Sequence, residues 1–103
     1  ITEKGKDYFE QLMVDYANQH VPILFDFNVV ITNLNKMDKS KALELVTQLR
    51  SSIVASKQAN NKYAAEYYSH LPLVGRTIFD EQQLLYNALL EWIDTFERQF
   101  KEE

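Results

Sequence analysis

An apolar stripe at helical spacing runs through the first third of the chain and crosses a proline without changing phase. Its members recur every three or four residues, which places them on one face of an α-helix: Phe9, Leu12, Tyr16, His20, Ile23, Phe27, Val30 or Ile31, and Leu34. Pro22 removes a backbone donor and bends a helix axis. The stripe therefore predicts one long first helix that is capped by Thr2, extends to about Lys36 and is kinked at Pro22.

The segment around Pro22 allows two other interpretations. The first helix could end at His20 or Val21, with Pro22 opening the next helix at its first position, where proline is favoured. The β-branched cluster that follows is also typical of a strand. Three consecutive apolar residues at 29–31 break the alternation of a strand, however, and the chain offers no convincing partner strand. We therefore favour a helix, and both helical interpretations keep the stripe on one side.

Two further apolar patterns predict two more helices. Glycine and proline occur only twice each, so few positions can interrupt a helix. The second predicted helix covers residues 38–69, and Asp38 or Ser40 can cap it. The third opens at Thr77 or Asp80 and continues to the basic residues near the end of the chain.

Short connections make consecutive helices antiparallel. At 103 residues the chain has the length of one ordinary domain. We therefore expect an all-α fold, a three-helix up-down-up antiparallel bundle with a long first helix kinked at Pro22, in a single domain that spans residues 1–103.

The composition argues against several classes of function. The chain has no cysteine, which excludes disulfides, thiolate catalysis and cysteine-based zinc sites, and its net charge of −4 argues against a nucleic-acid-binding surface. His20 and His70 lie far apart in the predicted bundle, and no phosphate-binding glycine loop or nucleophile elbow occurs. We therefore expect no metal site, no cofactor and no enzymatic activity. A run of about 18 apolar residues, which a membrane-spanning helix needs, is also absent.

The predicted helix lengths leave one end of the bundle uncovered. The first two helices would each span about 50 Å and the third about 35 Å, so the turn between the first two would protrude by roughly 15 Å. Either the kink folds this tip back, or an exposed apolar surface remains that marks a binding site. In the second case we expect self-association or a protein partner at six residues of the tip: Val30, Ile31, Leu34, Met37, Leu43 and Val46.

An alternative function depends on aromatic residues further along the chain. Tyr63 and Tyr67 fall on one side of the second predicted helix, and Trp92 lies on the third. Such residues either form an aromatic core layer or line a cleft for a ligand. In the second case the chain is a helical ligand-binding or sensor domain whose site consists of Asn60, Tyr63, Tyr67 and Trp92.

These patterns favour a non-enzymatic helical protein-interaction module. The chain begins at Ile1 rather than at Met. We therefore expect that an N-terminal segment was trimmed, which was a signal, a membrane anchor or a disordered leading segment. On this interpretation the chain is the soluble part of a bacterial membrane-anchored or secreted protein, such as a lipoprotein, and lies outside the cytoplasm.

Overall fold

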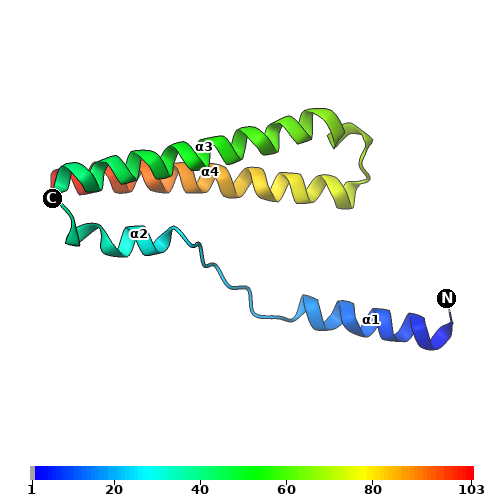
Figure 1. Ribbon diagram of the computed structural model, residues 1–103. Coiled ribbons are helices and arrows are strands. Elements are labelled where there is room, and N and C mark those ends of the chain that lie inside the picture. Colours follow the sequence, from blue (N-terminus) through cyan, green and yellow to red (C-terminus); the bar gives the residue numbers. More distant parts are fainter. Residues whose placement is uncertain (1) are drawn as a thin grey trace.

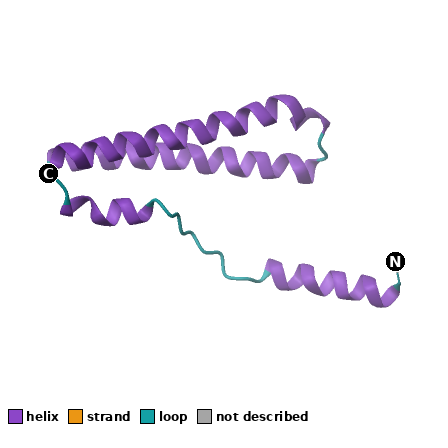
Figure 2. Cartoon of the chain, viewed as in Figure 1, coloured by secondary structure: helices purple, strands orange, loops and turns teal. Residues whose placement is uncertain are grey.

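The computed structural model describes residues 2–103, which form helices joined by turns and by one extended segment (Figure 1). This range contains four α-helices and no β-strand (Figure 2): α1 (Glu3–Ala17), α2 (Asn28–Asn33), α3 (Lys39–Tyr67) and α4 (Leu73–Glu102). Two short 3₁₀ helices, η1 (Leu34–Lys36) and η2 (Tyr68–His70), follow α2 and α3. The predicted all-α fold is therefore confirmed.

The molecule is elongated. Its principal extents are 62 × 31 × 16 Å and its radius of gyration is 19.4 Å, whereas a compact domain of this length has a radius of gyration of about 13 Å. Figure 1 shows the reason: α3 and α4 lie side by side as an antiparallel hairpin, α2 lies beside one end of it, and α1 stands apart. The structure is thus more open than the predicted bundle.

The first helix does not continue through Pro22, and that prediction is wrong. α1 ends at Ala17, where the Asn18 side chain donates a hydrogen bond of 2.8 Å to the carbonyl of Val14. Proline disfavours helical backbone at the residue before it, here the β-branched Val21. Residues 18–27 consequently form an extended connection with a turn at its end, and helix resumes only at Asn28.

The third predicted helix starts earlier than expected, and its predicted shortness is also wrong. α4 begins at Leu73 because the carbonyl of Pro72 accepts helical hydrogen bonds from the amides of Gly75 and Arg76, at 2.9 and 3.0 Å. α4 has 30 residues and α3 has 29. The two helices therefore match in length, and neither leaves a protruding tip.

Three contacts set the register of the hairpin along its length. At the open end, where α3 begins and α4 ends, the Lys39 ammonium donates to the carbonyl of Phe100 and lies 4.0 Å from the centre of its ring. Arg50 bonds to α4 further along. Near the turn end, the Tyr68 hydroxyl donates to Asp80 at 3.0 Å.

The buried core occupies only the open half of the hairpin. Its members are Leu34, Ala42, Val46, Ile53, Ile93 and Phe100. α2 and η1 form a third layer over this half, because Leu34 is 2% exposed and Phe27 stacks on Trp92 with ring centres 5.8 Å apart. Between Ile53 and Ile93, where no third layer is present, no residue is buried. Residues of the hairpin are therefore buried only in the half that α2 and η1 cover.

The docking of α2 leads to a test by core truncation. Leu34→Ala should lower the free energy of unfolding by about 2–4 kcal/mol, because it removes a fully enclosed side chain and leaves a cavity between α2 and the hairpin. Val29→Ala is the matched control, since Val29 lies in α2, five residues before Leu34 of η1, but is 66% exposed; its effect should stay within about 0.5 kcal/mol. Urea unfolding followed by circular dichroism measures both. Equal effects of the two substitutions would show that α2 is not packed in this way.

Candidate functional site

The residues of the predicted tip surface lie inside the molecule. Leu34 and Val46 are 2% and 1% exposed, and Val30, Ile31 and Leu43 pack partly buried against the same core. Met37, in the turn after η1, is 37% exposed. The reason is that α4 extends to the open end and α2 covers it. In this structure, five of the six residues contribute to internal packing rather than to an uncovered surface.

The structure does not bring together the four residues of the predicted aromatic cleft. Tyr63 and Tyr67 stack on one another with ring centres 6.0 Å apart, while Trp92 stacks between Phe27 and Phe96. The hairpin register places Trp92 roughly 14 Å from Tyr63 along the helix axis.

The space beside the two tyrosines is a depression on one helix. It measures about 260 Å³, and all its lining residues belong to the last turns of α3: Lys62, Tyr63, Glu66 and Tyr67. A cleft between helices would need residues from α4 as well. Trp92 and Asn60 do not line this depression.

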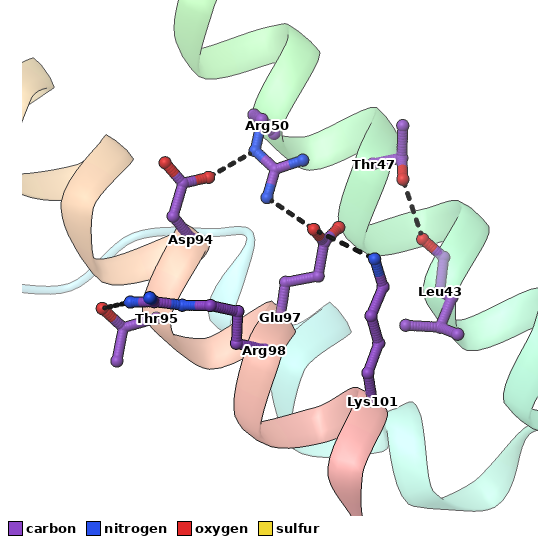
Figure 3. Close-up of polar contacts among 8 residues, drawn as sticks. All are labelled: Leu43, Thr47, Arg50, Asp94, Thr95, Glu97, Arg98 and Lys101. Carbon is purple, nitrogen blue, oxygen red and sulfur yellow. Dashed lines mark hydrogen bonds and ion pairs between the residues drawn. The ribbon is translucent and has the colours of Figure 1, made fainter.

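A charged cluster joins α3 to α4 in the open half (Figure 3). Arg50 donates through Nε to Asp94 Oδ1 at 2.7 Å and through an Nη to Glu97 Oε1 at 2.9 Å. The Lys101 ammonium lies 3.6 Å from the same Glu97 oxygen. The hydrogen bond from Arg50 lowers the pKa of Glu97, and Glu97 in turn raises the pKa of Arg50. These charges neutralise one another, so the cluster acts as a cross-link between the helices.

The Arg50 cluster predicts a loss of stability in acid. Because the pKa of Glu97 is lower in the folded chain, Glu97 stabilises the fold fully above its unfolded pKa of about 4.3, and this contribution is lost as the pH falls through the lowered value. At neutral pH, Glu97→Gln should reduce the free energy of unfolding by about 1 kcal/mol. Near pH 2 the variant and the parent chain should differ little.

Urea unfolding at several pH values measures this difference. Glu91→Gln is the matched control, because Glu91 is exposed and lines the same surface depression as Arg50 and Glu97 but has no ion pair with Arg50. A difference for Glu97→Gln that stayed constant from pH 7 to about pH 2 would contradict the assigned role.

Two searches of residues 2–103 bear on other kinds of site. No group of three or more His, Asp or Glu side chains is placed to hold a metal ion. No helix in this range is both long and apolar enough to span a membrane.

The half of the hairpin near the turn carries an exposed apolar surface, which we call the distal face. It consists of two side chains of α3 and three of α4, which are 45–75% exposed: Tyr63, Tyr67, Val74, Ile78 and Leu85. All five belong to the stretch between Ile53 and Ile93 in which no residue is buried.

The distal face continues the surface that α2 covers. Ile78, Leu85 and Trp92 follow one another at intervals of seven residues along α4, which is nearly two full turns, so all three lie on one side of the helix. Trp92 stacks on Phe27, the residue that precedes α2. On α3, Tyr67 lies two such repeats after the buried Ile53. On α4 the apolar side therefore continues beyond the part that α2 covers, whereas on α3 the polar residues Ser56 and Asn60 separate Ile53 from Tyr63 and Tyr67.

Sequence reasoning missed most of the distal face because it placed the uncovered end of the bundle at the opposite end. The seven-residue repeat of Ile78, Leu85 and Trp92 was the available signal. It becomes informative once α4 is known to begin at Leu73, because Ile78 then lies within the helix rather than at its edge.

A second uncovered apolar surface lies on α1. Thr2 caps this helix as the sequence predicts, since its hydroxyl accepts a hydrogen bond of 3.0 Å from the Gly5 amide. Phe9, Met13 and Tyr16 are 46–67% exposed, and no residue of α1 is buried. The chain therefore carries an amphipathic helix without a partner and a helical hairpin with an uncovered apolar side.

Comparison with protein-family models, curated proteins and solved structures found no match for the chain. The function is therefore argued from these two surfaces.

Proposed function

We propose that this chain is a helical protein-interaction module that binds an amphipathic helix on the distal face of the α3–α4 hairpin. The observation that carries the proposal is the exposure of Tyr67, Ile78 and Leu85 in phase with the side of the hairpin that α2 already covers. Contiguous exposed apolar surface of this kind is typical of interaction sites.

The packing of α2 indicates what kind of partner fits. Phe27, Val30 and Leu34 lie at i, i+3 and i+7, and they contact or pack against the apolar side of the hairpin. A second helix with the same spacing would meet the same kind of surface further along, as in helix-in-groove recognition. With such a helix in place, the module would have the three-helix up-down-up arrangement that the sequence predicts.

The chemistry of the charged groups supports binding rather than catalysis. Arg50, Asp94, Glu97 and Lys101 are committed to one another in ion pairs. A catalytic acid or base instead needs a free position beside its substrate and a pKa near the operating pH. The proposed function therefore depends on the apolar face.

A peptide titration tests the proposed function. The probe is a fluorescent 15-residue amphipathic peptide with leucine at i, i+3, i+4 and i+7 on a Glu/Lys background, and a scrambled peptide of the same composition is its control. The chain carries Phe9→Glu and Leu12→Glu so that α1 cannot compete for the surface. We expect binding by fluorescence anisotropy with a Kd of about 10 µM, which is modest for a single helix in an open groove.

The binding site is located with two neighbouring substitutions. Leu85→Glu should weaken binding of the peptide by about tenfold or more, because it places a charge in the apolar contact. Asn87→Glu should change the Kd by less than about twofold, because Asn87 is exposed and is rotated by about 160° from Leu85 around α4. Absence of binding, or equal effects of the two substitutions, would refute the proposed function.

A further inference from the structure

We infer that the helix that occupies the distal face is α1 of the same chain, folded back about the extended segment 18–27. This inference rests on the proposed function, because it names the occupant of that same face. The bound form is a closed molecule, in which α1 and α2 together cover the apolar side of the hairpin.

α1 needs a partner to remain a helix in water. An isolated helix of 15 residues is marginal even with favourable composition, and most helical stability in proteins comes from packing of an apolar face. The apolar face of α1 is formed by Phe9, Leu12, Met13 and Tyr16, and all of α1 lies outside the buried core. The contact therefore covers apolar surface on both partners.

The lengths of the two surfaces agree. α1 has 15 residues and is about 22 Å long. The uncovered side of α4 runs from Val74 to Leu85, a rise of about 17 Å. One helix of the size of α1 covers this stretch and stops short of Trp92, where Phe27 already packs.

The direction of α1 also fits. In Figure 1, α1 and α2 run the same way, opposite to α3, and α1 lies toward the turn end of the hairpin, where the distal face is. Docking therefore needs α1 to move sideways and toward the open end of the hairpin, but it needs no reversal of the chain. The docked α1 would run antiparallel to α3, as neighbouring helices in an up-down-up bundle do.

The connection is long enough, and its length favours the chain's own α1 over the α1 of a second copy. The segment 18–27 spans up to about 33 Å when extended, and it is anchored where Phe27 stacks on Trp92. Leu85 is seven residues from Trp92 along α4, or roughly 10 Å. A short tether gives an effective concentration on the order of millimolar, which exceeds that of a second copy in a micromolar solution.

Disulfide trapping tests this inference, because the chain contains no cysteine and only introduced thiols can react. Met13→Cys is combined in turn with Ile78→Cys, Gln82→Cys or Leu85→Cys on the docking side of α4. The control pairs Met13→Cys with Asn87→Cys, which is exposed on the opposite side of α4. A disulfide needs Cα atoms about 4.4–6.8 Å apart, so at least one docking-side pair should oxidise about tenfold faster than the control. The product should be an internally bridged monomer.

Two outcomes of the trapping experiment would overturn the inference. A covalent dimer as the main product would show that α1 occupies the face of a second copy. Equal rates for all four pairs would show that α1 does not dock there. If the amphipathic peptide still binds in a Leu85-dependent way, the proposed function survives this failure, whereas absence of peptide binding removes both proposals.

Small-angle X-ray scattering provides a second measurement that needs no thiols. The unmodified chain should have a radius of gyration below that of the open structure, whose Cα atoms alone give 19.4 Å, at concentrations where it is monomeric. The Phe9→Glu, Leu12→Glu variant should return toward that value, because its α1 cannot pack on the distal face. An unmodified monomer as extended as this variant would contradict the closed form.

Discussion

Two helices packed side by side bury only the stripe of residues between them, and this limit explains most features of the structure. Side chains that flank the contact between α3 and α4 become buried only where a third layer covers the hairpin. α2 and η1 supply that layer over the open half, and the buried residues Val46, Ile53 and Ile93 all lie there. Where the third layer stops, burial stops as well.

The interactions between α3 and α4 are concentrated in the same open half of the hairpin as the buried residues. In the open half, an aromatic ladder joins Phe27, Trp92, Phe96 and Phe100, and the charged cluster around Arg50 lies between α3 and α4. In the distal half the register depends on contacts such as the exposed hydrogen bond from Tyr68 to Asp80, which raises the pKa of the tyrosine. We therefore expect the distal half to open more readily than the rest of the hairpin.

Hydrophobic periodicity and capping residues were sufficient to predict the helix ends that have no proline nearby. The second predicted helix, 38–69, agrees with α3 to within two residues, and the Thr2 cap of α1 is as expected. The failures occur at the two prolines. Hydrophobic periodicity does not include the cost of helical backbone before Pro22, and Pro72 opens a helix that was predicted to begin only at Thr77 or Asp80. Both errors altered helix length, and the uncovered apolar surface was consequently expected at the open end of the hairpin, which α2 covers in the structure.

The apolar stripe that crosses Pro22 is nevertheless continuous in phase, and the break divides it into two parts. Phe27, Val30 and Leu34 are packed against the hairpin, whereas Phe9 and Tyr16 belong to a helix on a ten-residue connection. An unbroken helix would cover the hairpin permanently. With the break, coverage of the distal face becomes an equilibrium between an open and a closed molecule, as we propose. A competing helix then has to overcome the effective concentration of α1, so the length of the connection sets how tightly a partner must bind.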